Sequence, residues 1–172
     1  MISLHLSQIL LSKLYTMTAT IRKIKREDLA SLKEVIDTSD LFPSEYLDAM
    51  IQPFFGNVDS SDVWLTQEHK GKPISIAYCA PERMTEGTFN LYLIAVHKNY
   101  QSRGLGAELI KYLEERLAAE GVRVLIVETS GLDDFERTRN FYDQQGYHRE
   151  AVIRDFYQEG ENKVVFWKRL QS

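Results

Sequence analysis

The sequence has one cysteine, four prolines and no apolar run close to the roughly 18 residues that cross a membrane as a helix. A single cysteine, Cys79, excludes an intramolecular disulfide and is typical of a reducing compartment. Basic residues are not in excess, because 21 Lys and Arg stand against 25 Asp and Glu, a net charge of −4. That balance argues against nucleic acid held by bulk electrostatics. We therefore expect a cytoplasmic protein without a membrane or nucleic-acid partner.

The residues that are present indicate one ordinary globular domain. The chain has 172 residues, of which 44% are hydrophobic and 27% charged, enough for one well-buried core. Residues 1–16 have the pattern of a short amphipathic helix, but the only basic residue there, Lys13, lies on the wrong side of the apolar stretch for a secretory signal. Met17 opens a stretch typical of a domain start. We expect an extension over 1–16 and one domain over 17–172, with no metal site assigned.

Hydrophobic periodicity predicts alternating strands and helices. Strands are expected at 19–24, 62–69, 73–81, 89–97, 122–130, 148–157 and 163–170, with a turn at 70–72, and helices at 26–37, 42–52, 105–120 and 134–145. Pro43 opens the second helix, and Pro53 is predicted to end it. This order predicts an α/β fold, a mixed sheet of about six or seven strands with helices on both faces. Cys79 falls in the apolar run ISIAYCAP, which indicates a buried structural thiol.

The stretch NYQSRGLGAELI, residues 99–110, places two glycines where a strand gives way to a helix. The first N–H groups of a helix lack partners, and together with the helix dipole they form an anion site. Gly104 and Gly106 carry no Cβ that would keep a phosphate away, and Arg103 can add charge. The nucleotide-binding P-loop requires Gly-Lys-Ser/Thr, and the dinucleotide fingerprint requires a glycine where Leu109 stands. A pyrophosphate cradle and a plain structural turn both remain open.

A longer block favours the cradle. The stretch LYLIAVHKNYQSRGLGAELIKYLEE, with Gln-x-x-Gly-x-Gly at its centre, resembles the acetyl-CoA-binding core of the GCN5-related N-acetyltransferases, the GNAT superfamily. The later TRNFYDQQGY is similar to the family's helix that carries a Phe-Tyr pair before a glycine. The resemblance covers residues 20–170 and implies a GNAT fold with acetyl-CoA as cosubstrate.

The resemblance also implies which residues bind this cosubstrate. The end of the central strand would pair its backbone with the pantetheine arm, as an added strand does, and the glycine turn would hold the pyrophosphate. The implied cofactor-binding residues are Ile94, Ala95, Val96, Gln101, Ser102, Arg103, Gly104, Leu105, Gly106 and Ala107.

The same resemblance suggests a general acid. Tyr142 matches the family's tyrosine that protonates the departing CoA thiolate, and a phenol is protonated at neutral pH. Packing alone is the competing interpretation of Tyr142. The family's asparagine seven residues earlier is replaced by Phe135, and Asn140 lies on another helical face, so one cofactor contact departs from the pattern.

The general base is less well defined. Where many relatives carry a glutamate, this chain has Asn90, which cannot act as an acid–base group. Glu128, at the end of the next strand, is the preferred substitute. Asp133, Asp134, His97 or a chain of waters are the alternatives, although a histidine after a strand is more often structural.

The resulting hypothesis is an N-acetyltransferase that moves an acetyl group from acetyl-CoA to a primary amine by direct attack in a ternary complex. The acceptor is a small-molecule or peptide amine, and Asp155, Phe156 and Tyr157 could border its pocket. An acyl-CoA-binding regulatory module with weak or no catalysis is the alternative, which Asn90 and Phe135 keep open. A homodimer is compatible with the sequence.

Overall fold

The computed structural model describes residues 19–39 and 42–170, so the expected extension over 1–16 lies outside the described residues. The strands are β1 (Thr20–Lys23), β2 (Val63–His69), β3 (Lys72–Pro73), β4 (Ser75–Pro81), β5 (Thr88–Val96), β6 (Val124–Ser130), β7 (His148–Gln158) and β8 (Glu161–Arg169). The helices are α2 (Leu29–Ser39), α3 (Tyr46–Gly56), α4 (Leu105–Ala119) and α5 (Glu136–Gln144), with 3-10 turns at Arg26–Asp28, Lys98–Tyr100 and Asp133–Phe135. Among these helices none is long and apolar enough to cross a membrane.

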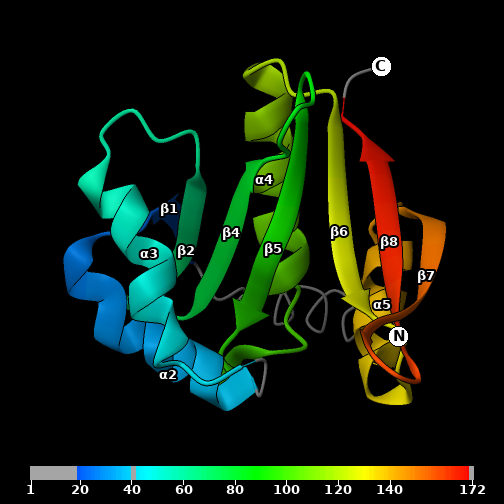
Figure 1. Ribbon diagram of the computed structural model, residues 1–172. Helices are drawn as coiled ribbons and strands as arrows, with labels where there is room; N and C mark the ends of the chain where they lie inside the picture. Colours follow the sequence, from blue (N-terminus) through cyan, green and yellow to red (C-terminus); the bar gives the residue numbers. More distant parts are fainter. Residues whose placement is uncertain (1–18, 40–41, 171–172) are drawn as a thin grey trace, which may run out of the picture.

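The strands form one mixed sheet in the order β1-β2-β4-β5-β6-β8-β7, with β3 paired to β2, which confirms the predicted α/β class. Among the strands of the described residues, β5 and β6 alone run parallel, as the strand–helix–strand unit requires, and α4 connects them. Their pairing extends from Thr88–Val124 to Leu91–Val127 and then stops. Beyond that point the two strands separate toward the end of β5, as Figure 1 shows. The sheet is therefore split at its centre.

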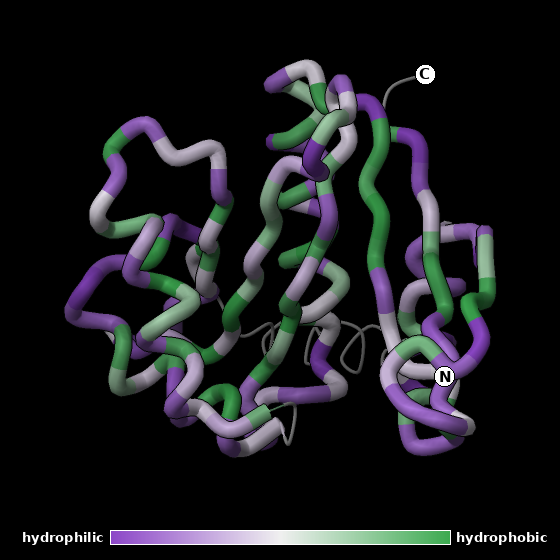
Figure 2. Tube along the Cα trace, viewed as in Figure 1, coloured by the Kyte–Doolittle hydropathy of each residue, from purple (hydrophilic) through white to green (hydrophobic). Residues whose placement is uncertain are grey.

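Helices cover both faces of the sheet. In Figure 1, α2 and α3 lie in front of the left half of the sheet, α4 lies behind its centre, and α5 lies behind its right half. The core behind the sheet gathers the apolar stripe of α4, which includes Leu109 and Leu113, against Val127 and Phe166. The core in front packs α2 and α3 around Trp64. Figure 2 shows the apolar segments along the central strands and on the inner sides of the helices.

The second helix differs from its prediction. It begins at Tyr46, because Pro43 belongs to a preceding turn, and it continues through Pro53 to Gly56. A proline removes one helical hydrogen bond, yet Phe54 is buried against Trp64 at a ring distance of 6.5 Å. The Arg26 guanidinium also donates to the Phe55 carbonyl at 2.8 Å. Tertiary packing and this capping contact compensate for the missing bond.

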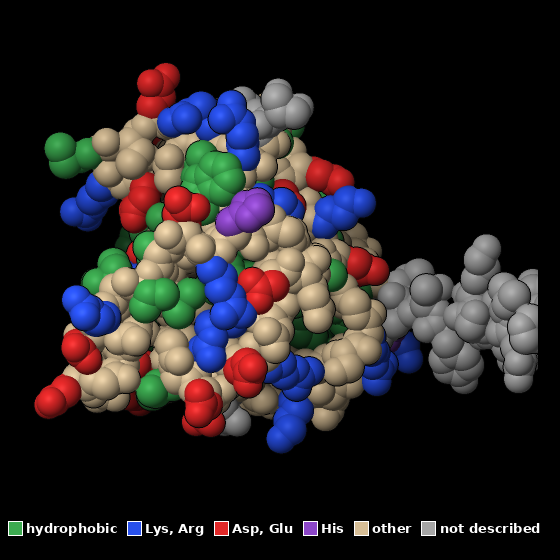
Figure 3. All heavy atoms as spheres, turned by 90° about the vertical axis from the view of Figure 1, so that its right-hand side faces the viewer, with side chains coloured by type: hydrophobic (Ala, Val, Ile, Leu, Met, Phe, Trp, Pro, Cys, Tyr) green, Lys and Arg blue, Asp and Glu red, His purple; other side chains and the backbone are tan. Residues whose placement is uncertain are grey.

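The last strand pair forms an exposed edge. All eleven residues of β7 are exposed, and the register with β8 slips twice, after Arg149 and after Ile153. Figure 3 shows this side of the molecule, where basic and acidic side chains intermingle around hydrophobic ones. Bulges and mixed charge are devices that blunt an edge strand against unwanted pairing.

Candidate active site

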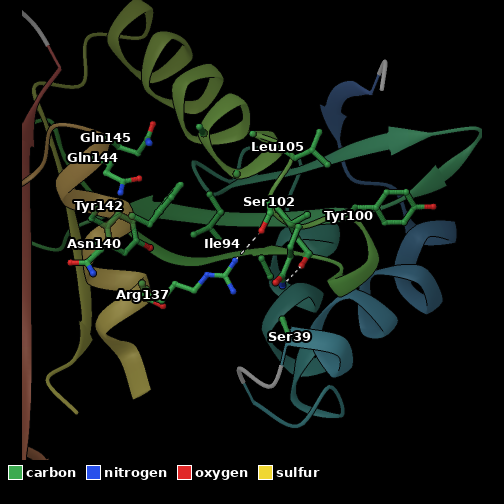
Figure 4. Close-up of a pocket in the computed structure, with 18 of the residues that line it drawn as sticks. Ser39, Ile94, Tyr100, Ser102, Leu105, Arg137, Asn140, Tyr142, Gln144 and Gln145 are labelled. Carbon is green, nitrogen blue, oxygen red and sulfur yellow. Dashed lines mark hydrogen bonds between the residues drawn. The ribbon is translucent and has the colours of Figure 1, made fainter. Parts of the chain in front are cut away.

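A cavity of about 950 Å³ opens between the end of β5, the start of α4 and α5. Nine of the ten residues predicted to bind the cofactor line it: Ile94, Ala95, Val96, Gln101, Ser102, Gly104, Leu105, Gly106 and Ala107. Tyr142, the predicted acid, lines it as well. The cavity adjoins the split in the sheet, so the structure brings together segments that are far apart in the sequence (Figure 4).

The glycine turn ends in a bare helix N-terminus. Gly104 caps α4 with φ of 82°, a left-handed conformation that favours glycine. The first helical hydrogen bond runs from the Glu108 N–H to the Gly104 carbonyl at 3.0 Å, so the N–H groups of residues 105–107 have no partner within the helix. A Cβ on Gly104 would meet nothing within 4 Å. Packing therefore does not demand a glycine there, whereas the backbone conformation does.

The end of β5 has one edge whose backbone groups pair with no other strand of the described residues. On the other edge, Ile94, Ala95 and Val96 pair with β4, opposite Ala77, Ile76 and Ser75. Toward β6 the pairing has already ended at Leu91. The Gln101 amide donates to the Val96 carbonyl at 2.9 Å, so this side chain holds the turn against the strand. The edge facing the cavity can accept an extended, amide-bearing ligand as an extra strand.

The positive charge in the cavity comes from a residue that the sequence analysis did not single out. Arg137, in the first turn of α5, reaches across the cavity and donates to the Ser102 hydroxyl at 3.2 Å (Figure 4). Arg103 does not line the cavity; its guanidinium donates to the Asn99 carbonyl at 3.1 Å and lies over the Tyr100 ring. Arg137 follows the β6 strand by seven residues, so its neighbourhood with the glycine turn depends on the fold. No local pattern in the sequence marks it.

Tyr142 lies deep at the wall of the cavity. It is 4% exposed and packs at ring distances of 5.3 Å to Phe141, 5.6 Å to Tyr147 and 5.3 Å to Phe166. Burial raises the pKa of the Tyr142 phenol. The hydroxyl therefore stays protonated throughout the neutral range, and the ring contacts hold the phenol in place.

Glu128 does not line this cavity and lies on the opposite face of the sheet. Its neighbour Val127 belongs to the core behind the sheet, and successive side chains of a strand alternate between faces. Glu128 is the first residue of β6 beyond the segment paired with β5. Its Oε2 accepts from the Lys163 ammonium at 2.9 Å, and the Lys163 side chain is 8% exposed. A carboxylate thus stands at the opening of the split sheet.

The other residues considered for the position of the general base have different surroundings. His97 is buried and accepts from the Asn99 N–H at 3.2 Å through Nδ1, which is a structural role. Asp134 lines the cavity, whereas Asp133 does not. Asn90 is 2% exposed on the same sheet face as Glu128.

Two further sequence departures are located by the fold. Phe135 ends a 3-10 turn outside the cavity, while Asn140 lines it beside Phe141. Asp155 lies in β7 and accepts from the Gly160 N–H at 2.8 Å, so it stabilises the β7–β8 turn. Cys79 is fully buried, as predicted, and burial raises the pKa of its thiol.

Comparison with known families identifies this arrangement. The profile of the acetyltransferase (GNAT) family matches residues 28–147, which include β5, the glycine turn, α4 and α5. The chain belongs to the GNAT family of acetyltransferases. None of the curated proteins compared with the chain matches it.

Solved structures agree with this assignment. A GNAT-family protein from Desulfovibrio desulfuricans is 25% identical, with a TM-score of 0.85 over 89% of this chain and 99% of that one. The ribosomal-protein-S18-alanine N-acetyltransferase from Escherichia coli is 20% identical, with a TM-score of 0.72 over 90% and 96%. An aminoglycoside 6′-N-acetyltransferase complexed with coenzyme A is 15% identical, with a TM-score of 0.72 over 88% and 97%. These last two share the fold with this chain.

Proposed function

We propose that the protein is an N-acetyltransferase that moves the acetyl group of acetyl-CoA to a primary amine by direct attack in a ternary complex. The observation that supports this most is the joint position of the bare α4 N-terminus and Tyr142 in one cavity beside the split in the sheet. A neighbour of the same fold is complexed with coenzyme A.

The cavity fits the parts of acetyl-CoA. The free N–H groups of residues 105–107 and the Arg137 guanidinium can bind the pyrophosphate, since both favour negative charge. Arg103, at the same turn, can reach the outer phosphate oxygens from the solvent side. The backbone of 94–96 would pair with the pantetheine arm, which directs the thioester into the split between β5 and β6.

The reaction then uses one residue from each face of the sheet, Tyr142 on the cavity side and Glu128 on the opposite side. The amine nitrogen forms a bond to the thioester carbonyl carbon, and the carbon–sulfur bond breaks. Tyr142, which its raised pKa keeps protonated at neutral pH, gives its hydroxyl proton to the departing sulfur. Glu128 takes the proton that the nitrogen loses, from the opposite face of the sheet. No side chain carries the acetyl group.

Calorimetric titration with acetyl-CoA tests the proposal. The Gly104→Glu variant puts a carboxylate beside the free N–H groups, and we expect it to abolish the binding that the unaltered chain shows. Gly71→Glu is the matched control, because Gly71 has φ of 78° and equally open surroundings on a distant turn. Binding that survives in Gly104→Glu would contradict the cradle. Acetyl-CoA binding without acetylation of any amine would support the regulatory module instead.

A further inference from the structure

The front face of the sheet, opposite the acetyl-CoA cavity, carries a row of aromatic rings next to Glu128. Trp64 and Tyr78 stack across β2 and β4 at 4.0 Å with an interplanar angle of 12°, and Tyr92 continues the stack at 5.5 Å. Tyr78 pairs with Leu93 and Cys79 with Leu91, so Tyr92 is the extra residue of a β-bulge. Tyr92 is 51% exposed, and the row ends in an open aromatic ring.

Carboxylates flank this aromatic row. The hydroxyl of Tyr78, the middle ring of the row, donates to Asp62 Oδ2 at 3.2 Å. Burial raises the pKa of Tyr92, the negative charges of Glu82 and Glu128 raise it further, and a hydrogen bond with the Asn90 side chain lowers it. Glu128 has its charge balanced by Lys163, whereas Asp62 and Glu82 contribute negative charge beside the rings. Aromatic faces and carboxylates together attract cations.

A buried amide on this face has a carbonyl oxygen without a partner, although its side chain is hydrogen-bonded to Tyr92. Asn90 is 2% exposed and stands on β5 opposite Ile126, on the same face as Glu128 and next to Tyr92. Its Oδ1 has no hydrogen-bond partner among the described residues. A buried acceptor without a donor is costly, and an ammonium group supplies only donors.

We propose that the acceptor is a small aliphatic diamine, which is a dication in solution. This rests on the proposed acetyl transfer. One amine, in its neutral form, lies at Glu128 and attacks the thioester. The other remains an ammonium and lies over the exposed Tyr92 ring, within reach of Glu82 and Asp62. A monoamine of the same length would reach the reacting position without these contacts, and so would bind more weakly.

Steady-state acetylation of cadaverine and pentylamine tests this proposal, because the two amines differ only in the second ammonium. We expect kcat/KM for cadaverine to exceed that for pentylamine about tenfold, from one ion contact and one cation–π contact. The Asp62→Asn/Glu82→Gln double variant removes the ion contact and should reduce this ratio to about two- to threefold, the part that the cation–π contact contributes. Asp59→Asn/Glu115→Gln removes the same charge from exposed positions and should keep the ratio.

The outcomes separate this inference from the proposed function. Equal kcat/KM for the two amines, or a ratio that the Asp62/Glu82 variant leaves unchanged, would overturn the diamine while acetyl transfer stands. Faster acetylation of a lysine peptide or a peptide N-terminus than of cadaverine would overturn it too, and so would acetyl-CoA binding without acetylation of cadaverine. Absence of acetyl-CoA binding by the folded chain would overturn both.

Discussion

The Lys163 ammonium on β8 lies 2.9 Å from Glu128 Oε2 on β6, and its Nζ also lies 3.4 Å from the centre of the Phe156 ring. A buried ammonium needs a counter-charge, so this pair fixes the Glu128 carboxylate at the opening of the split sheet. One carboxylate oxygen is thereby occupied. We expect the other to meet the acceptor amine.

Glu128→Gln should lower kcat about 100-fold, because an amide cannot take the proton of the attacking amine. The affinity for acetyl-CoA should stay unchanged, because Glu128 does not line the cavity. Lys163 loses its counter-charge, so the free energy of unfolding should fall by about 1–2 kcal/mol. Acetylation assays, calorimetry and urea unfolding measure the three effects. Glu115→Gln, on the exposed face of α4, is the control; equal kcat in both variants would exclude Glu128 as the base.

Tyr142→Phe should lower kcat about 100-fold as well, with the acetyl-CoA dissociation constant unchanged. The ring contacts remain, so the fold should be retained. Burial raises the pKa of Tyr142, so the acid form is fully present at neutral pH and is lost only in strongly alkaline solution. The alkaline limb of the rate profile should therefore not report this residue. Unchanged kcat across the profile would remove Tyr142 from the mechanism.

The two arginines near the glycine turn give a discriminating pair of variants. Arg137→Gln should weaken acetyl-CoA binding about tenfold, because this guanidinium lies in the cavity and can form charge-assisted hydrogen bonds to phosphate. Arg103→Gln should weaken it less, since Arg103 contacts Asn99 and Tyr100. Calorimetry on both variants gives the comparison. A larger effect at Arg103 would assign the pyrophosphate to the residue that the sequence pattern suggests.

Asp28 is expected to make stability depend on pH. Burial raises the pKa of its carboxyl, but hydrogen bonds from Arg22 and from the Lys25 N–H outweigh this, and the net pKa lies below its usual 3.8. A carboxyl with a lowered folded-state pKa stabilises the fold above its unfolded pKa, and this is lost as pH falls through the folded value.

Asp28→Asn should therefore cost about 2–3 kcal/mol in urea unfolding at neutral pH. The difference from the unaltered chain should shrink as the pH falls below about 4, where the unfolded carboxyl becomes protonated. Asp59→Asn, at an exposed position, should show no such dependence. A cost that stays constant down to acidic pH would mean that Asp28 acts through packing rather than through its charge.

Much of the fold could be predicted from periodicity. The apolar stripe of α4, the β-branched run of β6 and the parallel β5–α4–β6 unit are local or near-local patterns. Pro53 misled the prediction of the second helix. A proline weakens a helix locally, and only the burial of Phe54 against Trp64 shows why α3 continues.

By itself, the sequence determined the glycine turn, the helix that follows it and the Phe-Tyr pair, because turn chemistry and helix capping act between residues a few positions apart. It also pointed to the family to which the chain belongs. The tertiary structure alone decided that Arg137 faces Ser102, that Lys163 holds Glu128, and that Tyr78 and Tyr92 stack beside Asp62. These relationships join residues of different strands and helices, and sheet register and helix packing set them, which no local pattern encodes.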